Sequence, residues 1–412
     1  MTILELGEFS RNLLFPFGMG IMATLNMIGS GELSKEYPSK GLKLKKHPFM
    51  SVWVMFMAEA SIIIFYFIER QKTKNKRAPT QRTVVLDTFE VTETISPDDH
   101  IEVLPGENKI YTLLIIFMCL VFDLLATTTL IFFRENASFI ELILKLITIF
   151  ISTMLSQWIL KYKYHKHHAF GILLVSVGLI IYTIIDFMIS GIKLSDVSIP
   201  LTLLSLVLYL LSAFQEVSEK YLMDTKYVSP FVVISFEGFG GVVVMIIVFL
   251  VLNQIDCTQD SLICDYDSTS NHSVENFFET ISYIFSHYEY YFPFIKLYFS
   301  MLFFNLFRLK TNEHYSPTHR SIADCFGSLC KWILTLALPF LDAGNVTPLS
   351  IVGTSIAYVI IMIGLVIYLE IIVVKVLGLE RNTRYHIIQR EEHINLTEEL
   401  FKVNEDKKNT IL

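Results

Sequence analysis

Stretches of about twenty predominantly apolar residues recur along this chain, separated by short polar connections. A helix of that length crosses roughly 30 Å of hydrocarbon, the thickness of a bilayer core. Of the 412 residues, 53% are hydrophobic and 18% are charged, whereas about a quarter of the residues of a soluble protein carry charge. The sequence therefore predicts an all-α polytopic membrane protein whose helices contact the lipid bilayer.

The apolar windows predict ten transmembrane helices. Glu5 and Glu8 precede the first window, no basic segment comes before it and no small-residue cleavage site follows, so we expect a retained span and not a cleaved signal peptide. The expected spans lie near 12–31, 48–69, 110–133, 137–160, 168–191, 198–222, 230–252, 288–309, 317–340 and 348–372.

Basic residues indicate how these spans are oriented. Ten spans place both termini on one side, and the segments that share that side hold most of the Lys and Arg, Arg308 and Lys310 among them. Lysines between 35 and 46 oppose this assignment. We expect cytosolic termini, with the charged segments 70–109 and 373–412 cytosolic and poorly ordered.

The segment 253–287 has the composition of a lumenal loop. It contains no Lys or Arg, and it carries Cys257, Cys264 and the glycosylation sequon that begins at Asn271. In an oxidising lumen the two cysteines could form a disulfide and Asn271 could be glycosylated; the alternative is two free thiols in a solvated acidic loop.

A weak internal repeat divides the chain into two five-helix units, residues 1–191 and 192–372, followed by the tail 373–412. Glu59 in the second span corresponds to Glu237 in the seventh. At nearly the same offset, Glu141 and Lys145 of the fourth span correspond to Arg320 and Asp324 of the ninth, with the signs of charge reversed. Because five spans separate the units, the second must be inverted in the membrane.

The charged residues of the ninth span fall on one side of a helix. At 100° per residue, Asp324 lies about 40° and Lys331 about 20° from Arg320. In the fourth span Glu141, Lys145 and two hydroxyl residues share a sector of about 60°. We expect both stripes to line one aqueous path; the alternative is that Arg320 with Asp324, and Glu141 with Lys145, are i,i+4 pairs that only lower the cost of insertion.

Motifs spread over most spans resemble the drug/metabolite transporter superfamily, whose repeats are called EamA-like. Within it, the chain is similar to the nucleotide-sugar-transporter group of solute carrier family 35, closest to its F-type member six branch. The resemblance implies two inverted repeats, an endomembrane address such as lysosome, endosome or Golgi, and transport. The matching residues are His47-Pro48-Phe49, Glu59, Phe122-Asp123, Gln215, Glu219-Lys220, Glu237-Gly238, Phe303-Phe304-Asn305, Ser316, Thr318, Arg320, Asp324 and Trp332.

These patterns predict a transporter that moves a small anionic metabolite by alternating access. Lys145 and Lys331 would give the path a cationic patch, and the isolated acids Glu59, Asp123 and Glu237 could neutralise lysines, carry protons or bond to backbone. The alternatives are a solute such as an amino acid, or a scaffold or receptor that retains the fold without transporting.

Other chemistries find little support in the sequence. His165, His167 and His168 stand among lysines in a short connection, where a solvated basic loop is the simpler interpretation than a metal site. No nucleotide-cradling glycine loop and no nucleophile with a recognisable base is present. We therefore expect no enzyme activity, no cofactor and no nucleic-acid partner.

Overall fold

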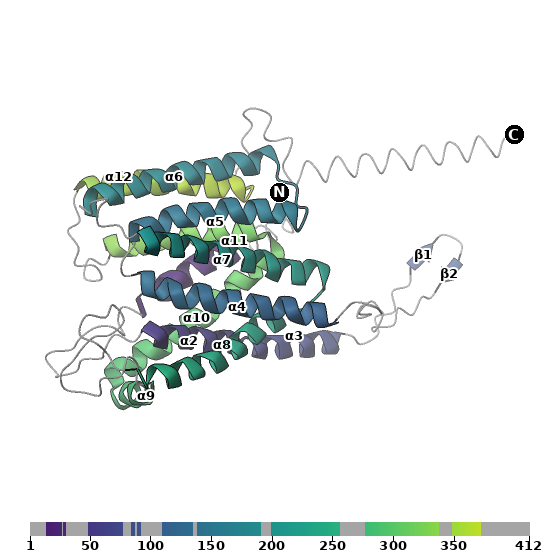
Figure 1. Cartoon of the computed structure of the whole chain (residues 1–412). Helices are drawn as coiled ribbons and strands as arrows, with labels where there is room; N and C mark the ends of the chain where they lie inside the picture. Colours follow the sequence, from purple (N-terminus) through teal and green to yellow (C-terminus); the bar gives the residue numbers. More distant parts are fainter. Residues whose placement is uncertain are drawn as a thin grey trace.

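A computed structural model of the chain describes residues 14–26, 28–29, 48–76, 84–86, 89–91, 109–134, 138–190, 199–255, 277–337 and 348–371. Apart from two three-residue strands that pair antiparallel, β1 (Val84–Leu86) and β2 (Phe89–Val91), the regular structure is helical. The helices pack side by side in a bundle (Figure 1).

Each range predicted as a span contains helix, and one further helix lies in the loop predicted at 253–287. The helices are Leu14–Asn26, α2 (Pro48–Ser61), α3 (Ile63–Lys76), α4 (Lys109–Arg134), α5 (Ser138–Trp158), α6 (Lys166–Ser190), α7 (Ile199–Thr225), α8 (Pro230–Leu252), α9 (Phe277–Ser286), α10 (Tyr288–His314), α11 (Pro317–Ala337) and α12 (Pro348–Tyr368).

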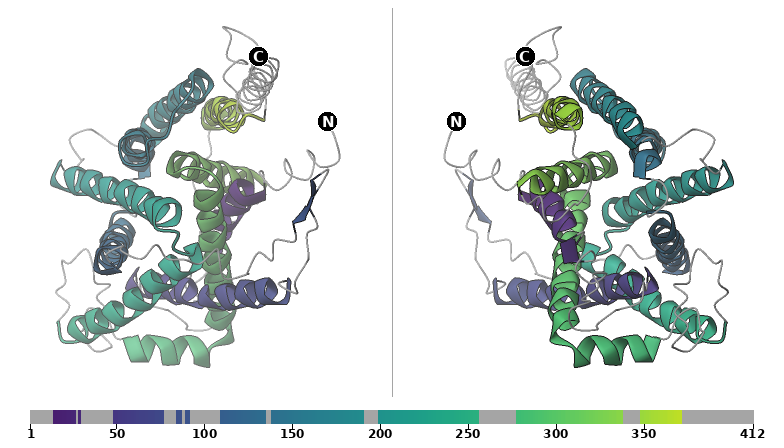
Figure 2. Two further views of the ribbon diagram at one scale, coloured as in Figure 1. Left: turned by 90° about the vertical axis from the view of Figure 1, so that its right-hand side faces the viewer. Right: turned by 90° about the vertical axis from the view of Figure 1, so that its left-hand side faces the viewer.

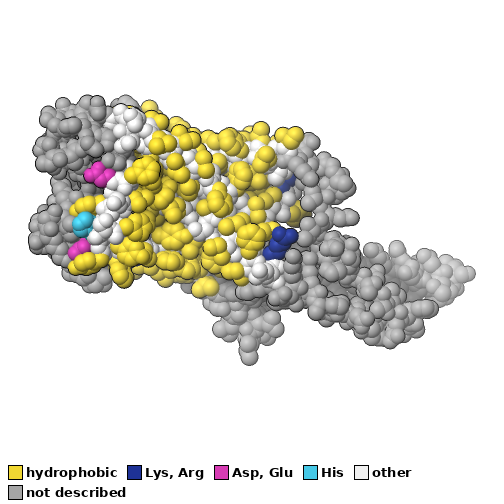
Figure 3. Space-filling view, turned by 90° about the horizontal axis from the view of Figure 1, so that it is seen from below, with side chains coloured by type: hydrophobic (Ala, Val, Ile, Leu, Met, Phe, Trp, Pro, Cys, Tyr) yellow, Lys and Arg dark blue, Asp and Glu magenta, His cyan; other side chains and the backbone are white. Residues whose placement is uncertain are grey.

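Within the part of the chain that the structure describes, six stretches are long and apolar enough to cross a membrane. They are Phe49–Gln71, Ile110–Thr127, Lys166–Ile189, Pro230–Leu252, Tyr288–His314 and Ile351–Tyr368. On the face shown in Figure 3, hydrophobic side chains form a broad band across the bundle, with acidic and histidine side chains at one edge and Lys or Arg at the other. The chain is therefore an all-helical, multi-pass integral membrane protein, and its apolar helices fit contact with the bilayer.

Two segments differ from the predicted outline. The span predicted at 48–69 is broken at Ile62, where the N–H groups of Ile62 and Phe65 donate to carbonyls only three residues earlier, at 3.0 and 2.9 Å. The loop predicted at 253–287 ends in helix α9, which packs Ile284 against α2 and α10. The sequence shows α9 poorly because its ten residues are too short to form a span.

The helices of one half pack against those of the other. α2 lies against α8, α5 against α11 and α6 against α12, while α4 packs on α7 and the helix Leu14–Asn26 packs on α10. The views along the bundle in Figure 2 show these neighbours. The α6 and α12 contacts run antiparallel: Gly171 meets Tyr368, Gly178 meets Ile361 and Ile185 meets Gly353.

Glycine allows the closest of these crossings. A Cβ added at Gly238 of α8 would lie 2.2 Å from the backbone nitrogen of Ala60 and 2.7 Å from the carbonyl carbon of Glu59. α8 therefore touches the backbone of α2 directly at Gly238. Glu237 and Glu59 consequently flank the same crossing, and both are buried.

We predict that Gly238→Ala destabilises the protein by about 1–3 kcal/mol, because the new methyl group meets backbone that can move only by parting the two helices. Gly240→Ala is the matched control, since its Cβ would meet the end of the Leu120 side chain, at 2.4 Å, which can change rotamer. Thermal unfolding of both variants in the same detergent checks this. Equal losses of melting temperature would contradict the close backbone contact.

Candidate functional site

Four long polar side chains lie buried in the second half of α7, a helix that begins as an apolar run. Gln215, Glu216, Glu219 and Lys220 are each less than 5% exposed. Positions 215 and 219, like 216 and 220, are one helical turn apart, so all four occupy one sector of the helix. The helix packs against α4, α5, α10 and α11, and it delivers these side chains to the centre of the bundle.

Glu219 is held by cations from two helices. Its Oε2 lies 2.5 Å from Nη1 of Arg320 in α11, and its Oε1 lies 3.8 Å from Nη2 of Arg308 in α10. Asn312 of α10 also donates to Oε2, at 3.2 Å. Because charge-assisted hydrogen bonds in a dry interior are the strong ones, Glu219 joins three helices.

Glu216 is held mainly by hydroxyl groups. Ser321 of α11 donates to its Oε2 at 2.7 Å, and Ser152 of α5 donates to the same atom at 3.0 Å. Arg320 Nε lies 3.5 Å from Oε1, so one guanidinium serves both glutamates. Arg320 is 1% exposed and has the largest of the fully buried side chains among the described residues.

This arrangement adds to one sequence-based interpretation and corrects another. Arg320, which the sequence pairs with Asp324 at i,i+4, forms ion pairs with Glu219 and Glu216 of a different helix. Arg308, assigned above to a polar cytosolic segment, is instead largely buried beside Glu219. The helix α10 continues to His314, so Arg308 lies inside it.

The network reaches the membrane edge at the end of α7. Lys220 Nζ lies 3.1 Å from Asp224 Oδ1 and donates to the backbone carbonyl of Glu313 at 2.7 Å. Tyr162, in the connection between α5 and α6, donates to Asp224. Burial, and then the hydrogen bond to Asp224, raise the pKa of Tyr162 above its ordinary value, so this tyrosine stays a donor.

A second group of buried acids lies where α2, α4 and α8 meet. Glu59, Asp123 and Glu237 are each 1–2% exposed, and one carboxyl oxygen of each has no hydrogen-bond partner among the described residues. The fully buried Asn305 of α10 has none at either amide atom. The three acids interact electrostatically with one another and with Arg308, which connects this group to the α7 network.

The fourth and ninth predicted spans, α5 and α11, pack against each other through polar side chains. Lys145 of α5 donates to Ser328 of α11 at 3.2 Å, and Thr153 donates to Thr318 at 3.3 Å. The structure thus places Lys145 against α11, close to the position of Lys331. Asp324 is half-buried on the same helix and acts electrostatically on Glu216.

Some predicted residues fall beyond the description. Cys257, Cys264 and Asn271 lie outside the described residues, and so do the side chains of Glu141 and Lys331. Four residues of the buried α7 network are absent from the solute path predicted from the sequence: Glu216, Glu219, Arg308 and Asn312. Acids in an apolar helix were a usable signal for Glu216 and Glu219, but their partnership with Arg308 and Asn312 requires the packing of α7 on α10.

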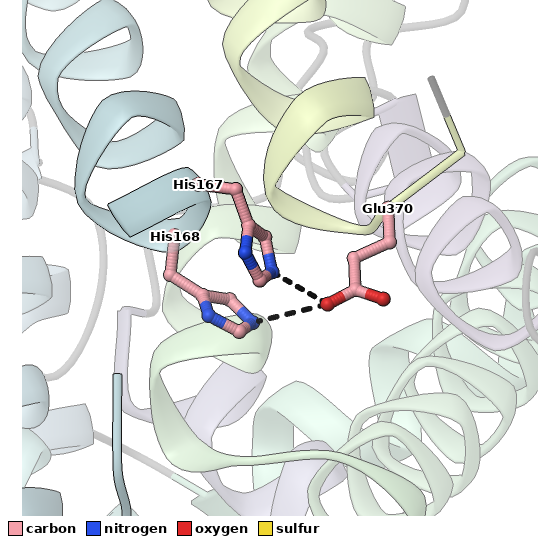
Figure 4. A group of neighbouring side chains, drawn as sticks. All are labelled: His167, His168 and Glu370. Atoms are coloured by element: carbon pink, nitrogen blue, oxygen red, sulfur yellow. Dashed lines mark ion pairs between the residues drawn. The ribbon is translucent and has the colours of Figure 1, made fainter. Parts of the chain in front are cut away.

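One group of side chains could hold a metal ion. His167, His168 and Glu370 bring one ligand atom each within 4.8 Å of one another (Figure 4). His167 is 3% exposed, so the interpretation of these histidines as a solvated loop is wrong for this residue. The reason is that α6 begins at Lys166 and packs its first turn against the end of α12.

No family model matches the chain, and no curated protein sequence matches it. Among solved structures, a chain described as "Crystal structure of protein" is similar, with 11% sequence identity and a TM-score of 0.46. The match covers 87% of this chain and 96% of the other. The function is therefore argued from the residues of the site.

We predict that Arg320→Gln destabilises the protein by about 3–5 kcal/mol, because it leaves two buried glutamates without their shared cation. Adding Glu219→Gln should restore part of this loss, which a double-mutant cycle of melting temperatures measures. Glu313→Gln is the control: it removes only an i,i+3 pair with Lys310 near the membrane edge and should change stability by less than about 0.5 kcal/mol. Equal effects of Arg320→Gln and Glu313→Gln would refute the central role of this ion pair.

Proposed function

We propose that this chain is a membrane transporter that moves a small solute across an endomembrane by alternating access. The observation that carries the proposal is the group Glu59, Asp123 and Glu237, buried within the apolar belt with carboxyl oxygens that lack hydrogen-bond partners among the described residues. Ionisable groups inside a membrane are costly, and they mark solute, ion or proton pathways.

A break in the second span lies close to this group of acids. The helix is interrupted at Ile62, three residues after Glu59, and the Ser61 hydroxyl is 2.5 Å from the Tyr298 hydroxyl of α10. A tightened turn with i,i−3 hydrogen bonds inside a helix often marks a hinge or a functional site. Glu59 is therefore next to both a polar cluster and a helix break.

Packing between the halves supports two inverted five-helix repeats. Repeat counterparts, α2 with α8, α5 with α11 and α6 with α12, pack against each other, as helices that lie close to a twofold axis in the membrane plane would. The same twofold relation converts the contact of α4 with α7 into the contact of α10 with the helix Leu14–Asn26, because α4 corresponds to α10 and α7 corresponds to Leu14–Asn26. Together with the motifs that resemble drug/metabolite transporters, this packing supports ten spans.

Basic residues support cytosolic termini. Lys161 and Lys163 lie between α5 and α6, and Lys166 begins α6; Lys226 lies between α7 and α8, and Lys310 lies near the end of α10. These connections are at one end of the bundle, and positive charge favours the cytosolic side. The same orientation would put Asn271 in the lumen.

The charges of the site suggest a role for each part. Lys145, on the α5 and α11 face, suits the anionic group of a small metabolite such as a nucleotide sugar or carboxylate. The acids Glu59, Asp123 and Glu237 share Arg308 as a nearby cation, and that leaves negative charge which a proton could offset. We therefore propose proton-coupled movement of an anion-bearing solute.

Uptake by purified protein in proteoliposomes tests the proposal. The screen covers nucleotide sugars, nucleotides, amino acids and polyamines, each with and without an imposed pH gradient. Substrate-dependent uptake that competes with unlabelled substrate is expected, and a substrate confined to polyamines would refute the anionic assignment. If no compound is taken up by folded, oriented protein, the scaffold or receptor alternative is favoured instead.

We predict that Lys145→Met lowers uptake of an anionic substrate by about tenfold or more, because a hydrogen bond to a charged group contributes about 1.5–3 kcal/mol. Lys226→Met, which removes a lysine from the edge of the bundle, is the matched control and should leave uptake within about twofold. The measurement is initial rate against substrate concentration. Unchanged kinetics in folded Lys145→Met would exclude this residue from the solute path.

We predict that Glu237→Gln removes the dependence of uptake on the pH gradient while exchange of labelled for unlabelled substrate continues, because the amide keeps the shape but cannot carry a proton. Glu279→Gln, on the short helix α9, serves as the control. The comparison requires that both variants have the same melting temperature and that equal amounts of each are reconstituted. Retained pH coupling in both Glu237→Gln and Glu59→Gln would show that these acids do not carry the proton.

A further inference from the structure

The beginning of α6 and the end of α12 meet in a compact group of ligating side chains, away from the α7 network. Nε2 of His167 lies 2.5 Å from Oε1 of Glu370, and Nε2 of His168 lies 3.9 Å from the same oxygen. Figure 4 shows both imidazoles turned toward this carboxylate. Two consecutive histidines at the start of α6 thus converge on one acid in the turn that ends α12.

The distances suit a small divalent ion. Ligand atoms about 2.0–2.1 Å from a tetrahedral zinc ion are separated from each other by roughly 3.3 Å. The two separations from Glu370 bracket that value, and all three ligand atoms lie within 4.8 Å of one another, so side-chain movements of up to about 1.5 Å would bring the group to it. Two imidazoles and one carboxylate are a common ligand set for zinc with one position left for water.

A simple ion pair does not account for His167. Although Nε2 is 2.5 Å from Glu370, neither ring nitrogen of this buried imidazole meets the alignment of a hydrogen bond. Buried polar atoms that lack aligned partners are uncommon in proteins. An ion bound beside His167 and Glu370 would give this buried nitrogen a partner.

The backbone at Glu370 adds a second indication. Its φ is 57°, in the left-handed region, and its N–H donates to the Ile367 carbonyl while that of Ile371 donates to Val366. These two hydrogen bonds form a Schellman motif with Glu370 at the position where glycine is strongly preferred. A residue other than glycine is strained there by about 1 kcal/mol, and Glu370 uses this conformation to direct its carboxylate at α6.

More imidazoles surround the group. The His165 ring centroid lies 6.1 Å from those of both His167 and His168, and the His319 centroid of α11 lies 6.2 Å from that of His168. The backbone N–H of His165 donates to Nδ1 of His168 at 3.3 Å. A metal at Nε2 of His168 needs the ring proton on Nδ1, so His168 must turn away from this amide, and His167 with Glu370 anchors the ion.

We propose that His167, His168 and Glu370 bind a divalent transition-metal ion, with zinc as the probe, and that the ion cross-links α6 to α12. This site lies where the start of α6 meets the end of α12, whereas the residues of the proposed solute path belong to α2, α4, α5, α8 and α11. It would fasten a helix pair that already packs through Gly171, Gly178 and Gly364.

The test uses full-length protein purified in detergent with an affinity tag that contains no histidine. Competition with a chromogenic chelator measures zinc affinity and stoichiometry, and thermal unfolding with zinc or magnesium gives an independent measurement. We expect one zinc per chain and a higher melting temperature with zinc than with magnesium, which prefers oxygen ligands.

Glu370→Gly is the decisive variant, because glycine fits the left-handed position and the protein should fold at least as well. We expect it to weaken zinc binding about tenfold or more and to abolish the zinc-dependent rise in melting temperature. His167→Gln should weaken binding similarly, and His165→Gln, the control in the same turn, should bind within about twofold of the unchanged protein. Equal zinc affinity in Glu370→Gly and the unchanged chain, or less than one zinc per chain, would overturn the proposal.

Discussion

The pairing of Arg320 with Glu219 and Glu216 is the interaction on which the rest of this bundle depends. A charge placed alone in hydrocarbon is too costly to keep, so each of these residues commits its helix to the others. Ser152 and Ser321 donate hydrogen bonds to Glu216, while Asn312 donates one to Glu219 and Arg308 forms a longer ion pair with it. The polar centre thus fixes which faces of α5, α7, α10 and α11 point inward.

The contacts between helices are of two kinds, which differ in how easily the helices can shift relative to each other. α6 with α12, and α2 with α8, touch at backbone level through glycines, where no side chain can change rotamer to open a gap. α5 meets α11 through hydroxyl groups and Lys145, whose hydrogen bonds can exchange partners with little change in distance. Under the proposed function, the second kind of contact is the one able to rearrange during transport.

The sequence predicts the helices well because hydrocarbon leaves a chain few choices: an apolar run of about twenty residues must be a helix. It also aligns Glu59 with Glu237, which the structure places at a single crossing. It does not predict the partners of Arg320 or the burial of Arg308 and His167, because these depend on which helices become neighbours. The break after Glu59 is likewise hidden, since no proline or glycine marks it.

The distribution of buried charge bears on what such a bundle can hold. In the α7 network the two glutamates face Arg320 and Arg308, so their charges balance and the group needs no further ion. At the crossing of α2 and α8, the acids Glu59, Asp123 and Glu237 add negative charge beside the same Arg308, whose guanidinium already serves Glu219. A balanced group of charges stabilises the fold, whereas an unbalanced one is stabilised by a proton or a bound ligand. Under the proposed function, the α7 network therefore holds the helices together and the acids at the crossing of α2 and α8 take part in binding.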